Sequence, residues 1–178
     1  MIDLPAKIVE LHQHLAQAQL PHAFGGALAL AWCTGQARAT IDIDINVFVP
    51  IDRMEEVFAA FPKAITATKE QRNVLTRDGQ VRLWWEQTPV DLFLNTLPFH
   101  ESVASRCRFE TFMDQPVPFL ACQDLAVFKA FFNRTKDWAD LEAMEDAGTL
   151  DKPAVAAILI DHLGQDDERI ATLMAVGN

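Results

Sequence analysis

The sequence has few basic residues, no long apolar run and few cysteines. Lys and Arg total 15 against 25 Asp and Glu, which gives a net charge of -10 at neutral pH. This balance argues against tight non-specific binding to nucleic acids, because such affinity comes mostly from basic side chains that displace counterions. The longest nearly uncharged stretch, residues 23–37, contains three glycines and is too short and broken to span a bilayer. We therefore expect no membrane partner.

The N-terminus and the cysteines add two expectations about the compartment. The first residues lack the basic flank and apolar run of a secretory signal, so we expect a cytoplasmic protein. Cys33, Cys107 and Cys122 are an odd number and contain no Cys-x-x-Cys pair. This spacing predicts reduced, buried thiols and not a zinc site.

The pattern of apolar residues predicts an α/β fold with a mixed sheet. We expect a core over residues 1–115 and a helical segment over residues 116–178 that packs on it. The 178-residue chain is long enough for one such domain. The expected elements are helix 4–20, strand 22–24, helix 27–33, strand 41–49, helix 53–61, a hairpin of strands 73–76 and 81–85 around Asp78-Gly79, strands 90–95 and 108–113, a break at 116–118, and helices from residue 123 onward.

Two carboxylates interrupt the Ile/Val-rich strand 41–49. Asp42 and Asp44 are two residues apart, so their side chains leave the same face, about 6 to 7 Å apart along the strand. Two close carboxylates repel unless a cation offsets their charge. Hard divalent ions such as Mg²⁺ suit oxygen ligands of this kind. The alternative is that both are solvent-facing residues of a half-exposed strand.

A third acid, Asp91, lies in the apolar strand 90–95. If this strand pairs beside strand 41–49, Asp91 comes within reach of the same ions. Three carboxylates match the two-metal arrangement for nucleotidyl transfer, in which one acid helps to activate the attacking hydroxyl.

Gly25-Gly26 stands between the strand 22–24 and the helix 27–33. Exposed backbone N–H groups and the positive end of a helix dipole at such a turn suit a triphosphate. On its own, however, this element is more often a plain turn. The surrounding order is more specific, because Arg38-x-Thr40 and the Asp42-x-Asp44 pair follow about a dozen residues later.

This order resembles the nucleotidyltransferase superfamily related to polymerase β, in which a glycine turn and a short helix precede an Asp-x-Asp strand. The Arg-x-Thr before the acid pair looks like the AbiEii-type toxin branch. The downstream segment that contains Lys129, Arg134, Asp137 and Asp140 is also similar to that branch. The resemblance covers roughly residues 22–145.

The resemblance implies an enzyme of the nucleotidyltransferase fold that moves a nucleoside monophosphate from an NTP to an acceptor hydroxyl. It implies that Asp42, Asp44 and Asp91 bind Mg²⁺, two ions in all, with Mn²⁺ as a substitute. The nucleotide-binding residues that it implies are Gly25, Gly26, Arg38, Thr40, Lys129, Arg134 and Asp137.

Three alternatives stay open for the acceptor and the activity. A toxin-like enzyme would modify RNA or protein and would have an antitoxin protein as partner, and the basic stretch 63–82 is compatible with a polyanion. An antibiotic-modifying nucleotidyltransferase would instead use a small molecule. A non-catalytic descendant that binds a nucleotide or a protein is the third, since Ala27 stands where many active members have Ser or Thr.

Overall fold

The computed structural model describes residues 3–177, and the chain divides into two compact units. One unit runs up to Gly26 and resumes over Ala39–Leu120, and the other comprises Ala27–Arg38 and the residues from Ala121 onward. The expected division into a core over residues 1–115 and a helical segment over residues 116–178 stays a prediction. Among the described residues, no helix combines the length and the apolar character needed to cross a membrane.

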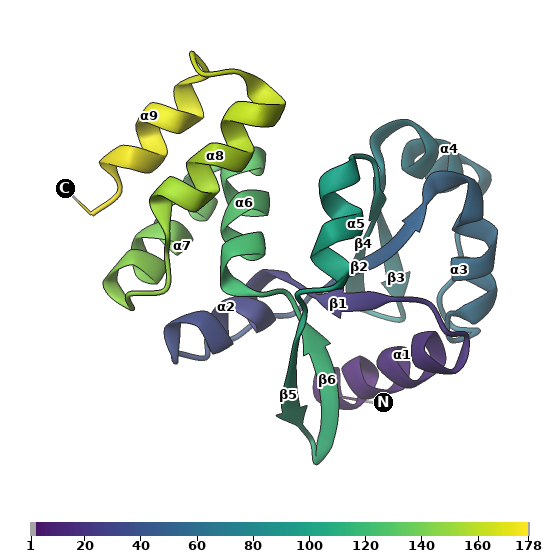
Figure 1. Ribbon diagram of the computed structural model, residues 1–178. Coiled ribbons are helices and arrows are strands. Elements are labelled where there is room, and N and C mark those ends of the chain that lie inside the picture. Colours follow the sequence, from purple (N-terminus) through teal and green to yellow (C-terminus); the bar gives the residue numbers. More distant parts are fainter. Residues whose placement is uncertain (1–2, 178) are drawn as a thin grey trace. The chain divides into compact units, whose positions relative to one another are not determined.

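The first unit is built on one mixed sheet, and Figure 1 labels its strands. Within the described residues the strands are β1 His22–Phe24, β2 Ile43–Pro50, β3 Gln80–Trp85, β4 Thr88–Asn95, β5 Arg108–Phe112 and β6 Gln115–Phe119. Their order in the sheet is β3-β4-β2-β1-β6-β5. The strand β2 pairs in parallel with β4 and antiparallel with β1, so it lies at the centre of the sheet. The expectation of a mixed α/β sheet is confirmed.

Alternating apolar side chains explain why β2 and β3 take these positions. Ile43, Ile45 and Val47 are fully buried, as the strict alternation of the sequence predicts. On β3 the alternation leaves Trp84 half-exposed and buries Trp85. The two tryptophans therefore point to opposite faces of the strand, as expected.

The helices of the first unit pack around this sheet. They are α1 Leu4–Gln17, the short 3-10 turn η1 Ile51–Arg53, α3 Met54–Ala60, α4 Lys69–Asp78 and α5 Pro98–Ala104. The side chain of Asp3 accepts a hydrogen bond from the N–H of Ala6 and caps α1. The helix α1 contacts α3 and β6, and α5 contacts β2 and β4.

The expected hairpin around Asp78-Gly79 is wrong, because residues 73–76 belong to the helix α4. Thr68 and Gln71 form a capping box at the start of this helix. Gly79 ends it in the left-handed conformation, and its N–H donates to the carbonyl of Leu75. The glycine is thus a helix stop and not a hairpin turn.

The expected break at residues 116–118 is also wrong, since the strand β6 runs through both prolines. Pro116 and Pro118 are two residues apart, so both missing N–H groups lie on the same side of the strand. Ladder bonds to β5 can then use the other side, and the register pairs Pro118 with Phe109.

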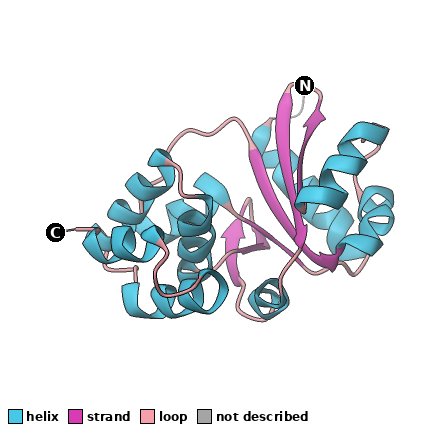
Figure 2. Cartoon of the chain, turned by 90° about the horizontal axis from the view of Figure 1, so that it is seen from above, coloured by secondary structure: helices cyan, strands magenta, loops and turns pink. Residues whose placement is uncertain are grey.

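The second unit consists of helices and loops within the described residues (Figure 2), as the helical C-terminal expectation requires. Its helices are α2 Gly26–Thr34, which begins at the last residue of the first unit, α6 Cys122–Phe132, α7 Thr135–Asp146, α8 Lys152–Leu163 and α9 Glu168–Ala175. The helix α6 contacts α7, α8 and α9 and forms the centre of this unit.

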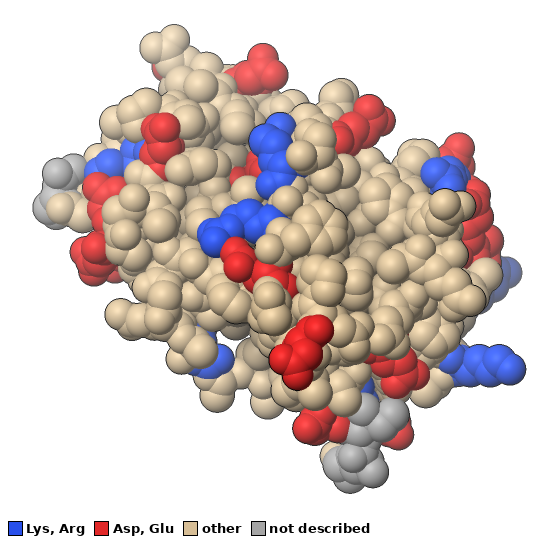
Figure 3. All heavy atoms as spheres, turned by 60° about the horizontal axis from the view of Figure 1, so that its bottom comes forward, with Lys and Arg blue, Asp and Glu red and all other residues tan. Residues whose placement is uncertain are grey.

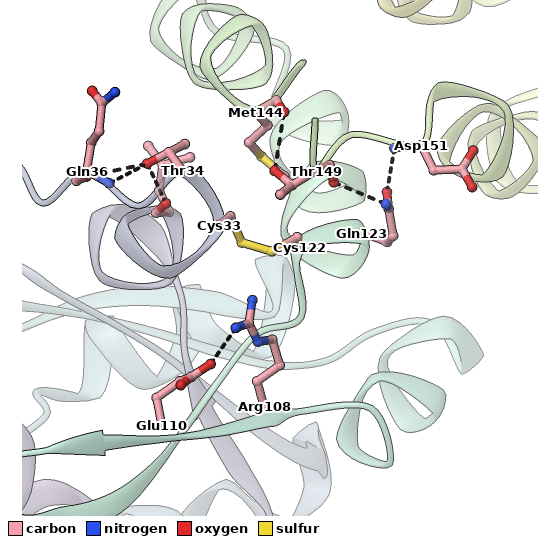
Figure 4. Close-up of a disulfide and its surroundings, with 11 residues drawn as sticks. Cys33, Thr34, Gln36, Arg108, Glu110, Cys122, Gln123, Met144, Thr149 and Asp151 are labelled. Carbon is pink, nitrogen blue, oxygen red and sulfur yellow. Dashed lines mark hydrogen bonds and ion pairs between the residues drawn. A yellow bond between two sulfur atoms is a disulfide. The ribbon is translucent and has the colours of Figure 1, made fainter. Parts of the chain in front are cut away.

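A disulfide joins Cys33 to Cys122, with their Cα atoms 5.5 Å apart. Figure 4 shows it between the end of α2 and the start of α6. The expectation of reduced thiols is therefore wrong for these two residues, while Cys107 keeps its thiol. Their separation of 89 residues gave no sign that the fold brings them together.

Candidate active site

Two carboxylates lie side by side at the centre of the sheet. In the parallel pair of β2 and β4, Asp44 is the register partner of Asp91. Adjacent strands are about 4.8 Å apart, and register partners in a parallel pair point to the same face. The strand that carries Asp91 thus lies beside the strand that carries Asp44, which is the condition under which the sequence places Asp91 near the acid pair.

Asp42 stands just before β2, because the strand begins at Ile43 and not at Ile41 as expected. Ile41 is 79% exposed, so burial does not hold it in the sheet. The hydroxyl of Thr40 donates to Oδ1 of Asp42 at 2.5 Å. Thr40 therefore orients the first acid of the pair, and its expected contact with a nucleotide stays a prediction.

The glycine turn fits closely against Asp44. The N–H of Gly25 donates to the Asp44 carbonyl at 2.9 Å. Gly26 has a φ of +53°, and a Cβ atom built on it would lie 1.8 Å from Oδ2 of Asp44. A side chain at this position would collide with the carboxylate, so the glycine is needed to seat Asp44.

Arg82, which sequence reasoning missed, lies among the three acids. On the antiparallel strand β3 it is the register partner of Asp91. Its Nε and Nη2 donate to the two oxygens of Asp91 at 2.7 and 2.6 Å, and Nη2 is 3.7 Å from Asp42. The hydrogen bond with Asp91 raises the pKa of Arg82, and the charges of Asp91, Asp42 and Asp44 raise it further.

The carboxylates suit a divalent ion in their chemistry. Asp42, Asp44 and Asp91 supply oxygen ligands, which Mg²⁺ and Mn²⁺ prefer. The guanidinium of Arg82 already pairs with Asp91 and lies 3.7 Å from Asp42. In the part of the chain that the structure describes, no three His, Cys, Asp or Glu side chains converge closely enough to hold a metal ion. The donors thus fit the metal, but the acids must draw closer together to share one.

The second unit contains a network of ion pairs made by other predicted site residues. Lys129 lies 2.5 Å from Asp140 and 3.8 Å from Asp137. Arg38 donates two hydrogen bonds to Asp140, at 2.6 and 3.1 Å. Arg134 reaches Asp137 at 2.5 Å. Three cations thus contact two buried carboxylates in this network.

Burial differs sharply within this network, which we call the cationic cluster (Arg38, Lys129, Arg134, Asp137 and Asp140). The side chain of Lys129 is 7% exposed, whereas those of Arg38 and Arg134 are 53% and 52% exposed. The two arginines are therefore accessible to a phosphate, while Lys129 holds the buried acids in place.

Asp140 belongs to the cluster, although the sequence suggested no role for it. Burial by itself raises the pKa of this carboxyl, but the hydrogen bonds from Arg38 and Lys129 outweigh burial, and the net pKa is lowered. The signal was available in the Asp137-x-x-Asp140 spacing, which puts both acids on one face of α7.

A cavity of about 320 Å³ lies in the second unit next to Arg38. Leu30 and Thr34 of α2 line it together with Ala143 and Asp146 of α7. The lining includes both apolar and polar side chains, which suits a small organic group.

No protein-family model matches the sequence, and no curated protein matches it. Solved structures do match. The crystal structure of ANT(2'')-Ia in complex with adenylyl-2''-tobramycin is 14% identical, with 94% of this chain and 95% of that chain covered and a TM-score of 0.59. The lincosamide antibiotic adenylyltransferase LnuA with lincomycin bound is 12% identical, with 79% and 96% covered and a TM-score of 0.53.

A third match is an antigenic nucleotidyltransferase-like protein from Paracoccidioides brasiliensis. It is 14% identical, with 95% of this chain and 92% of that chain covered, and its TM-score is 0.53. Identities this low establish an architecture and not an activity. The chain has the nucleotidyltransferase fold.

Proposed function

We propose that the protein is a metal-dependent nucleotidyltransferase that moves a nucleoside monophosphate from an NTP to an acceptor hydroxyl. The observation that carries this proposal is the register pairing of Asp44 with Asp91, with Gly26 packed against the Asp44 carboxylate.

Asp42, Asp44 and Asp91 would hold Mg²⁺ ions, two in number, and Mn²⁺ would substitute for them. Bound ions of this kind offset the charge that develops on the transferred phosphate. Asp91 is the residue we assign to accept the proton of the acceptor hydroxyl. The acceptor oxygen then forms a bond to the α-phosphorus, the bond from that phosphorus to the bridging oxygen breaks, and pyrophosphate leaves.

Phosphate binding is assigned to the turn before α2 and to the cationic cluster. The N–H of Gly25 is occupied by the Asp44 carbonyl, so Gly25 would contribute by leaving room for the nucleotide and not by donating. The amides that follow at the start of α2 remain suitable donors even with Ala27 in place of a hydroxyl residue. Arg38 and Arg134 are half-exposed and would pair with phosphate oxygens.

A small hydroxylated molecule is the acceptor that we favour. One structural neighbour is named a lincosamide antibiotic adenylyltransferase, another is ANT(2'')-Ia in complex with adenylyl-2''-tobramycin, and alignment covers 95% or more of the length of each. On the face drawn in Figure 3, acidic groups lie beside basic ones and most atoms belong to other residues. A surface of mixed sign and a net charge of -10 suit a neutral or cationic acceptor better than RNA. A toxin-like RNA or protein acceptor, with an antitoxin partner, is the competing hypothesis.

Calorimetric titration of the four NTPs in the presence of Mg²⁺ tests the proposal. We expect wild type to bind at least one NTP, and the Asp42→Asn/Asp44→Asn variant to lose that binding. The matched control is Asp161→Asn/Asp166→Asn, which removes the same charge from two exposed positions in α8 and in the loop before α9 and should bind like wild type.

Two outcomes separate the alternatives. Failure of folded wild type to bind any NTP would rule out the enzyme and leave a non-catalytic descendant. If binding is found, incubation with labelled NTP and either hydroxylated antibiotics or total RNA shows which acceptor becomes labelled.

A further inference from the structure

The carboxylate site carries its own positive charge. Three acids close together on a sheet repel one another, and an arginine from the neighbouring strand offsets part of their charge. Arg82 makes a two-pronged contact with Asp91 and lies 3.7 Å from Asp42.

The strand pattern fixes this position of Arg82. Alternate residues of β3 are exposed, and Arg82 is one of them. Since Asp91 is its register partner on β4, both side chains leave the same face of the sheet. The pairing of the two strands therefore places the guanidinium beside the carboxylate.

Arg82 is also able to leave. Its side chain is 52% exposed, and those of Asp42 and Asp91 are 30% and 21% exposed. A partly exposed ion pair contributes little net stability, because water solvates both partners when they separate. The buried Lys129–Asp140 pair of the second unit offers the contrast, because both of its side chains are under 10% exposed.

We infer that Arg82 is a tethered counter-cation, which a divalent ion must displace from Asp91 and Asp42 before the carboxylates can share the ion. This inference rests on the proposed function, since it assumes that the three acids bind metal. It also explains why the acids do not converge while Arg82 lies among them. The side chain that holds them in the absence of metal occupies the oxygens that a metal needs, so it weakens metal binding.

In the test, Mn²⁺ is titrated into the protein without nucleotide. Electron paramagnetic resonance measures the concentration of the unbound ion. We expect the Arg82→Gln variant to bind Mn²⁺ about fivefold more tightly than wild type, the upper end of the effect that a partly exposed ion pair supports. The control is Arg77→Gln, which removes the same charge and a similar two-pronged contact, to Asp78. It should leave the affinity for Mn²⁺ unchanged.

Thermal unfolding gives a second readout that does not depend on activity. Without metal, Arg82→Gln should unfold at a lower temperature than wild type, because the acids lose their counter-charge. Mn²⁺ should then raise its unfolding temperature by more than that of wild type. If Arg82→Gln does not fold, Arg82→Lys keeps the charge without the two-pronged contact and should show a smaller gain in affinity.

The failures are distinguishable. Equal or weaker Mn²⁺ binding by a folded Arg82 variant, with normal binding by wild type, would overturn the inference and leave the proposed function standing. Absence of Mn²⁺ binding by wild type and by the variants alike would overturn both.

Discussion

Gly26 and Asp44 are in close contact: a Cβ atom on Gly26 would lie 1.8 Å from Oδ2 of Asp44, so any side chain there requires the carboxylate to move. The strand–glycine–helix turn thus serves the carboxylate site directly. The stability of the turn and the binding of a nucleotide should therefore depend on the same residue.

The Gly26→Ala variant should lose both stability and NTP binding. A positive φ alone costs an alanine about 1 kcal/mol, and the collision with Asp44 adds to that cost. Gly35→Ala is the matched control, since Gly35 has a φ of +68° but a Cβ atom added to it would meet no atom within 4 Å. Chemical denaturation should show the larger loss for Gly26→Ala. Equal losses in the two variants would mean that Asp44 simply moves aside.

Substitutions in the cationic cluster should separate stability from phosphate binding. Lys129→Met would leave two buried acids with fewer partners and should cost about 3 kcal/mol of unfolding free energy. Arg38→Gln changes a half-exposed side chain, and Asp140 keeps its contact with Lys129 at 2.5 Å, so this variant should cost less than about 1 kcal/mol, while weakening NTP binding severalfold. Denaturation and calorimetry measure the two effects. Unchanged NTP affinity in Arg38→Gln would contradict its assigned role.

A pair of histidines should make the stability of the first unit depend on pH. His22 lies 2.7 Å from the Leu20 carbonyl through Nδ1 and 2.9 Å from Nδ1 of His12 through Nε2. Because a carbonyl only accepts, Nδ1 of His22 carries a proton. Burial lowers its pKa to about 4, and burial lowers the pKa of His12 as well.

Acid should destabilise the fold because the pKa of His22 is lowered. In the unfolded chain His22 binds a proton near pH 6.5, whereas in the folded chain it does so only near pH 4. Stability is therefore full above pH 6.5 and falls by about 3 kcal/mol as the pH drops to 4. Denaturation at several pH values should show this slope in wild type and a weaker one in His22→Gln. His14→Gln, at an exposed histidine of the helix that carries His12, serves as control and should keep the slope.

The Cys33–Cys122 disulfide should be measurable as a loss of reactive thiols. In denaturant without reductant, one thiol, that of Cys107, should react, and three should react after reduction. The chain-entropy relation gives the cross-link about 4 to 5 kcal/mol for residues this far apart, so reduction should lower the unfolding free energy. Cys107→Ser is the control and should abolish the single reactive thiol. Three reactive thiols in unreduced protein would show that Cys33 and Cys122 are free thiols, as expected from the sequence.

Much of the fold follows from local sequence patterns. The alternation of Ile43, Ile45 and Val47 determined the strand β2, and the lone acid in an apolar run marked β4. Where the local signals were ambiguous, the prediction was wrong. Asp78-Gly79 is typical of both a hairpin turn and a helix end, and the capping box at Thr68 decided for the helix. Pro116 and Pro118 suggested a break in the chain. Both lack their N–H on the same side of the strand, so β6 can still pair with β5 on the other side.

The sequence by itself determined which residue types could form the site, namely the acid pair, the third acid and the glycine turn, since these depend on spacing within single segments. Only the tertiary structure decided what lies against them. Arg82 meets Asp91 because β3 and β4 pair in one particular register, and Cys33 meets Cys122 because two distant helices pack together. Contacts of this kind depend on register and packing between segments far apart along the chain, and no local pattern of residues records them.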